Sequence, residues 1–110
     1  MFKKILIASV ALAPIFFTTG VMAISDAAKV GANAGAMTYC RGKFADGDTK
    51  SKYDLLKLKS FGVFDDLDGD DKAKALVMKK AAEDGDYLGD PLTRDRCDSL
   101  RKMLYIKYKD

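Results

Sequence analysis

The stretch KVGANAGAMTYC, from Lys29 to Cys40, decides the fold because it combines small residues at helical spacing with a cysteine at its end. Apolar residues recur here every three or four positions, which predicts a helix that begins after Ser25 or Asp26 and runs to about Phe44. The recurring set is Ala27, Val30, Ala34, Met37, Cys40 and Phe44.

Gly31 and Gly35 lie on one face of this predicted helix. A glycine inside a helix costs about 1 kcal/mol relative to alanine, so the pair needs a physical reason. One interpretation is that another helix approaches closely at this face. The other is that the segment is a loosely ordered start of the domain.

The first 23 residues have the pattern of a secretory signal peptide. Lys3 and Lys4 precede an uncharged stretch over 5–17, which is too short to cross a bilayer as a helix. Val21 and Ala23 then provide the small residues that signal peptidase requires. Residues 24–110 follow as a single domain, and we expect it to be periplasmic or secreted, with no membrane span after cleavage. The alternative is an uncleaved anchor, but no stop-transfer pattern follows.

The chain has two cysteines, Cys40 and Cys97, and an exported protein meets an oxidising compartment where they are expected to pair. The bridge would close a long loop, worth about 4 kcal/mol in the chain-entropy model. A redox-active pair is the functional alternative, but the C-x-x-C spacing of oxidoreductases is absent.

Three further helices complete the predicted fold, an all-α bundle of three to four helices with one disulfide. The second covers Lys52 to about Phe64, and the third covers Lys72 to Asp84 with Asp70 or Asp71 as its cap and Gly85 as its stop. The last begins after Thr93. The third helix is expected to bury Ala73, Leu76, Val77, Lys80 and Ala81, and the last Cys97, Leu100, Leu104 and Tyr108.

Composition excludes several classes of function. The chain of 110 residues has no histidine, which removes Ser-His-Asp and Cys-His catalysis and histidine-ligated metals. Removal of the signal reduces the net charge from +3 to +1, so there is no overall electrostatic case for nucleic acid binding. The basic residues of the last helix are interpreted as a solvated face: Arg94, Arg96, Arg101, Lys102, Lys107 and Lys109. We therefore expect a non-enzymatic protein without a cofactor, which binds an envelope protein or itself.

An acidic turn offers one candidate metal site. Asp65, Asp66, Asp68 and Asp70 crowd their carboxylates, and a cation such as Ca²⁺ would relieve the repulsion. An EF-hand register with Gly69 at loop position 6 fails at both ends of the loop. A second register around Gly89 matches only in part, with Asp84, Asp86 and Asp95. A solvated turn that caps a helix is the alternative to a low-affinity calcium site.

Three segments resemble the YjjA-like family of small exported bacterial proteins. They are Asn33–Cys40, Cys97–Leu100 and the helix of Tyr53–Phe61. The resemblance implies export, helices and a bridged cysteine pair, and it carries no catalytic residues. The acidic turn departs from that family.

Size, helices and a single disulfide are also similar to the HdeA/HdeB acid-stress chaperones. Acid would neutralise the carboxylates and leave an excess of positive charge that loosens the fold. An acid-activated chaperone is therefore an alternative function.

Overall fold

Helix α3 (Asp26–Phe44) is the centre of the computed structural model, which describes residues 25–109. The helix begins where the sequence predicts, because the Oγ of Ser25 accepts a hydrogen bond from the backbone N–H of Ala28 at 3.2 Å. Residues 31–37 are all buried, so this part of α3 is enclosed on every side. This stretch contains no charged residue, so it can be enclosed without burying unpaired charge.

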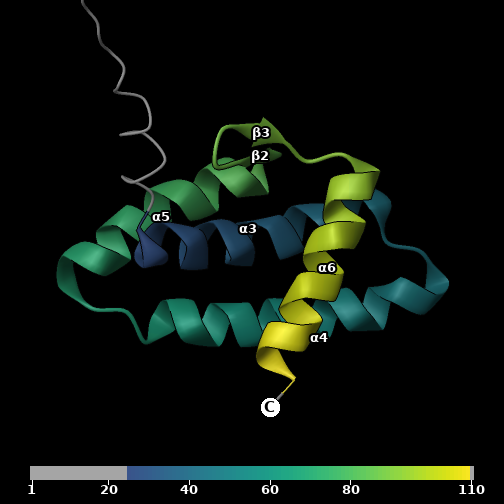
Figure 1. Ribbon diagram of the computed structural model, residues 1–110, viewed down its shortest axis with the longest axis horizontal. Helices are drawn as coiled ribbons and strands as arrows, with labels where there is room; N and C mark the ends of the chain where they lie inside the picture. Colours follow the sequence, from purple (N-terminus) through teal and green to yellow (C-terminus); the bar gives the residue numbers. More distant parts are fainter. Residues whose placement is uncertain (1–24, 110) are drawn as a thin grey trace, which may run out of the picture.

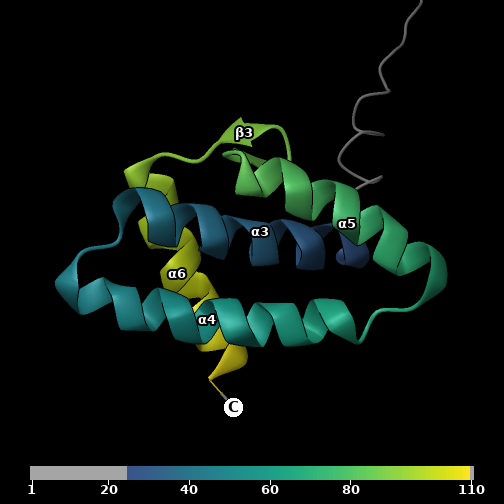
Figure 2. The ribbon, with the colours of Figure 1, turned by 180° about the vertical axis from the view of Figure 1, so that it is seen from behind.

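The other elements in the described part of the chain are α4 (Gly47–Asp65), α5 (Gly69–Glu83), β2 (Asp86–Tyr87), β3 (Asp90–Pro91) and α6 (Arg94–Tyr108). Figure 1 and Figure 2 show α3 between α5 and α4, with α6 crossing α3 and α4 at a steep angle. The prediction of a small all-α bundle is confirmed.

The two glycines of α3 lie against the backbone of α5. A Cβ atom added at Gly31 would overlap the carbonyl oxygen of Ala75, and one added at Gly35 would overlap that of Lys79. Only glycine lets the two backbones come this close. The close-approach interpretation is therefore correct, and α3 is not a loosely ordered start.

The buried face of α5 was predicted wrongly. Leu76 and Val77 are 41% and 62% exposed, whereas Ala75 and Ala82 are completely buried. The reason is the short distance to α3, which leaves room for alanine but not for larger side chains. Hydrophobic periodicity favours the large apolar residues and so selects the wrong side of this helix.

Two helices begin earlier than predicted. Helix α4 starts at Gly47 rather than Lys52, because the Oγ1 of Thr49 accepts a hydrogen bond from the backbone N–H of Asp46 at 2.9 Å and stabilises the first turn. Helix α5 starts at Gly69 rather than Lys72, with Asp68 as its N-cap residue in place of Asp70 or Asp71.

A small hairpin connects the last two helices, α5 and α6. Tyr87 pairs with Asp90 in β2 and β3, and the turn residues Leu88 and Gly89 both have positive φ angles, 52° and 96°. The hydroxyl of Tyr87 donates a 2.7 Å hydrogen bond to the Oδ1 of buried Asn33. This bond attaches the hairpin to α3 and satisfies a polar side chain inside the core.

Helix α6 agrees with its prediction. The Oγ1 of Thr93 caps it by accepting from the backbone N–H of Arg96 at 3.2 Å. Cys97, Leu100 and Leu104 are buried, and Tyr108 packs against the core from its edge. The core formed around them joins all four described helices and also contains Met37, Tyr53, Leu56, Ala82 and Leu92.

The predicted signal peptide, residues 1–23, lies outside the described residues. Within 25–109, no helix has the length and apolar character needed to cross a bilayer.

Alanine substitution at the helix contact is the first test. Gly31→Ala and Gly35→Ala should each lower the free energy of unfolding by at least about 2 kcal/mol, because the added methyl group meets rigid backbone. Gly42→Ala is the matched control in the same helix, since nothing lies within 4 Å of its added Cβ. It should be neutral or stabilise by up to about 1 kcal/mol. Urea unfolding measures all three, and equal effects would contradict the contact.

Candidate binding groove between α4 and α6

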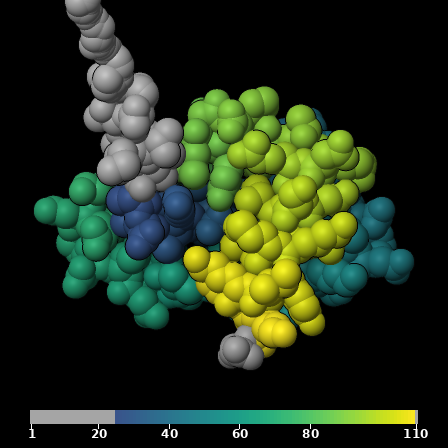
Figure 3. Space-filling view, in the orientation of Figure 1, coloured from purple at the N-terminus to yellow at the C-terminus, as the bar shows by residue number. Residues whose placement is uncertain are grey.

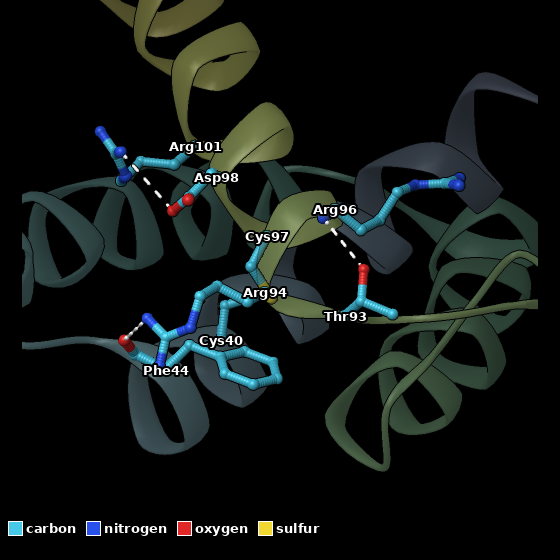
Figure 4. Close-up of a disulfide and its surroundings, with 8 residues drawn as sticks. All are labelled: Cys40, Phe44, Thr93, Arg94, Arg96, Cys97, Asp98 and Arg101. Carbon is cyan, nitrogen blue, oxygen red and sulfur yellow. Dashed lines mark hydrogen bonds and ion pairs between the residues drawn. A yellow bond between two sulfur atoms is a disulfide. The ribbon is translucent and has the colours of Figure 1, made fainter.

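The disulfide between Cys40 and Cys97 joins the last turns of α3 to the first turn of α6, with a Cα–Cα distance of 5.6 Å. Both cysteines are completely buried. Figure 4 shows Arg94 beside the bridge, where its Nη1 donates to the carbonyl oxygen of Phe44 at 3.3 Å. Buried and enclosed in this way, the pair has the environment of a structural disulfide.

The acidic turn does not form a compact set of ligands. Asp65, Asp66, Asp68 and Asp70 are all exposed, and two of them are cap residues, Asp66 at the end of α4 and Asp68 at the start of α5. Among residues 25–109, no three Asp, Glu or Cys side chains lie close enough together to hold a metal ion. Calcium binding at this turn stays a prediction that the geometry does not support.

The partial EF-hand register around Gly89 coincides with the hairpin. The Oδ1 of Asp86 accepts a 2.8 Å hydrogen bond from the backbone N–H of Gly89. That carboxylate therefore stabilises the turn.

Helix α6 crosses α4 and leaves a groove between them, with a volume of about 390 Å³. Figure 3 shows α6 lying across this face of the molecule. A second hollow of about 200 Å³ shares Leu56 and Tyr105 with the first. We call the two hollows together the α4–α6 groove. Its lining is Lys52, Leu55, Leu56, Lys59, Arg101, Lys102, Tyr105, Ile106, Tyr108 and Lys109.

The floor of the groove is apolar because of how the two helices are oriented. Leu56 is buried in the core and forms the bottom of the floor. Tyr105 and Ile106 lie outside the buried stripe of α6 and are 58% and 69% exposed. Leu55 on α4 is also exposed. Large apolar side chains thus stand side by side in solvent, which is typical of an interaction site.

Among the described residues, no acidic side chain lines the groove. The cationic residues in its lining are Lys52, Lys59, Arg101, Lys102 and Lys109. Arg101 pairs with Asp98 at 3.7 Å outside the groove, and the Nζ of Lys59 donates to the carbonyl oxygen of Tyr108. The groove therefore combines an apolar floor with a cationic rim, in which Asp98 partly offsets the charge of Arg101.

Two tyrosines belong to this region: Tyr53, which is buried beside the groove, and Tyr108, which is half-buried in its lining. Burial raises the pKa of Tyr53, while the guanidinium of Arg101, 5.8 Å from the centre of its ring, acts in the opposite direction. Burial also raises the pKa of Tyr108, which lines the second hollow. The same effect raises the pKa of Tyr87 in strand β2 of the hairpin.

The structure divides the basic residues that the sequence placed on one solvated face. Arg94 stacks over Phe44 and Arg96 over Tyr87, at 5.2 and 5.6 Å from the ring centres. Arg101, Lys102 and Lys109 turn toward α4 instead, where Lys52 and Lys59 join them. Lys52 and Lys59 are seven residues apart, which places them on the same face of one helix. This spacing was the signal in the sequence for a cationic face on α4.

Comparison of the chain with protein-family models, with curated proteins and with solved structures found no match. The resemblances to the YjjA-like family and to the HdeA/HdeB chaperones therefore stay predictions.

The raised tyrosine pKa values predict how stability responds to alkali. A phenol whose pKa is higher in the folded state ionises first in the unfolded chain, so folding loses stability as pH rises above about 10. Tyr53, Tyr87 and Tyr108 should all contribute. Urea unfolding between about pH 8 and pH 11 should show this decline, and Tyr87→Phe should reduce its slope. An identical slope in both proteins would refute the contribution of Tyr87.

Proposed function

We propose that this protein is an exported, non-enzymatic binding protein that holds an envelope partner in the α4–α6 groove. The observation that carries the proposal is the groove itself, where exposed Tyr105 and Ile106 lie beside buried Leu56 within a ring of cationic side chains. Exposed apolar surface rimmed by charge favours association with another molecule.

Export to the periplasm or beyond is part of the same proposal. It rests on the signal-peptide pattern of residues 1–23, and the closed Cys40–Cys97 bridge supports it, because such bridges persist in oxidising compartments. The two other candidate functions, an acid-activated chaperone and a calcium-binding protein, have no comparable feature among residues 25–109.

Site-specific photocrosslinking in the native envelope tests the proposal. A benzophenone side chain placed at Tyr105 should give a discrete adduct with one partner, whereas the same group at Val77 should not. Val77 is a matched control because it is also apolar and 62% exposed, but it lies on α5 and lines a separate hollow that shares no residue with the groove. The mass of the purified protein should also show that the chain begins at Ile24.

The adduct at Tyr105 should be lost when Lys52→Glu and Lys102→Glu are combined in the same protein. Equal adducts at Tyr105 and Val77, or none at Tyr105, would overturn the proposal. A protein that keeps residues 1–23, or that stays in the cytoplasm, would overturn its export.

A further inference from the structure

We infer that the partner binds through an acidic amphipathic peptide segment, with an apolar stripe flanked on both sides by Asp or Glu. This inference rests on the proposed function and names the chemistry of the partner at the same site. The segment would lay its apolar stripe on exposed Leu55, Tyr105 and Ile106 and direct its carboxylates to the two ends of the groove.

The placement of the cations supports carboxylates on both flanks. Lys52, Arg101 and Lys102 surround the larger hollow, while Lys59 and Lys109 border the smaller one. Leu56 and Tyr105 lie between these groups because both hollows share them. A ligand with a single anionic head group would use one end only, whereas a peptide with several spaced carboxylates would use both.

The shape of the site favours a helical segment. The groove lies between two crossing helices, and such grooves accept an amphipathic segment that inserts large side chains every three or four residues. The exposed side chains of Leu55 and Ile106 extend the apolar surface beyond the floor.

A symmetric dimer through the same face is disfavoured by charge. A twofold contact would place the groove of one copy against the groove of the other, so five cationic residues would face five more. Like charges brought together in an interface cost free energy and slow association. The occupant must instead bring negative charge.

A flat anionic membrane also fits the surface poorly. A third hollow beside the groove shares Lys59 and Tyr108 with it, and this hollow is lined by the carboxylates of Asp65 and Asp66. A lipid surface would meet these acids together with the lysines, whereas a narrow peptide passes beside them.

Fluorescence anisotropy with synthetic peptides tests the inference on the exported, disulfide-bonded protein. The probe is a labelled amphipathic peptide with Leu at every third or fourth position and Glu on both flanks. Its matched partner has Gln at every Glu position. The Glu peptide should bind saturably and at least about tenfold more tightly than the Gln peptide, and added salt should weaken it.

Protein variants locate the binding. Combined Lys52→Glu and Lys102→Glu, both exposed in the native protein, should weaken the Glu peptide by at least about tenfold. Combined Lys29→Glu and Lys80→Glu make the same change in net charge at exposed positions outside the groove, and they should alter affinity less than about twofold. Tyr105→Ala should also weaken binding, because it removes part of the apolar floor.

Three outcomes would overturn the inference. They are equal affinity for both peptides, no saturable binding of the Glu peptide up to about 1 mM, and equal effects of the two charge-reversal pairs. Two further results would overturn it as well. Preferential binding to vesicles of equal parts phosphatidylglycerol and phosphatidylcholine would assign the groove to a membrane surface, and self-association that Asp65→Asn with Asp66→Asn abolishes would assign it to the acidic turn of a second copy. If the Tyr105 photocrosslink forms while the peptide test fails, the proposed function stands and only the chemistry of the partner is wrong.

Discussion

Gly31 and Gly35 place the backbone of α3 against the carbonyl groups of Ala75 and Lys79 in α5, and the other helices are arranged around this contact. The missing side chains at Gly31 and Gly35 let the two backbones meet there, and the small side chains of Ala75 and Ala82 pack in the same interface and gain dispersion contacts. A helix held this closely on one side can be enclosed on its others by α4 and α6. The glycines weaken α3 as an isolated helix, and the tertiary contact offsets that loss.

The disulfide then determines where the groove forms. Since α5 and α4 lie on either side of α3, α6 packs across the face that they leave open, as Figure 1 shows. The bond between Cys40 and Cys97 fixes the first turn of α6 at the end of α3, and Leu100 and Leu104 anchor the following turns in the core. The remaining turns cross α4, and the divergence of the two helices exposes Tyr105 and Ile106 above Leu56. The groove is thus a consequence of how the last helix is attached.

Local signals in the sequence predicted much of this fold. Ser25 and Thr93 are caps as expected, the stripe of Cys97, Leu100 and Leu104 is buried, and the cysteines are bridged. These features depend on neighbouring residues or on the single pairing available. The buried face of α5 was wrong because a pattern of large apolar residues does not show that alanine is required at Ala75 and Ala82.

The groove was not predictable from the sequence for a different reason. Lys52 and Lys59 belong to one helix and Arg101 and Lys102 to another, so the cationic rim depends on the crossing of α4 and α6. The hairpin was missed because Leu88 occupies a positive-φ position that usually belongs to glycine or asparagine.

Helix α3 has two separate attachments, the glycine contact with α5 and the disulfide with α6. Hydrogen exchange on the Cys40→Ala, Cys97→Ala double variant tests most directly whether they act independently. Loss of the bridge should lower overall stability by about 4 kcal/mol or less, depending on how much the unfolded chain gains in freedom. Amides of α6 should exchange through a low-energy opening, while those of α3 and α5 should stay protected by the glycine contact. Equal loss of protection in α3, α5 and α6, or full protection of α6, would contradict a fold built on these two attachments.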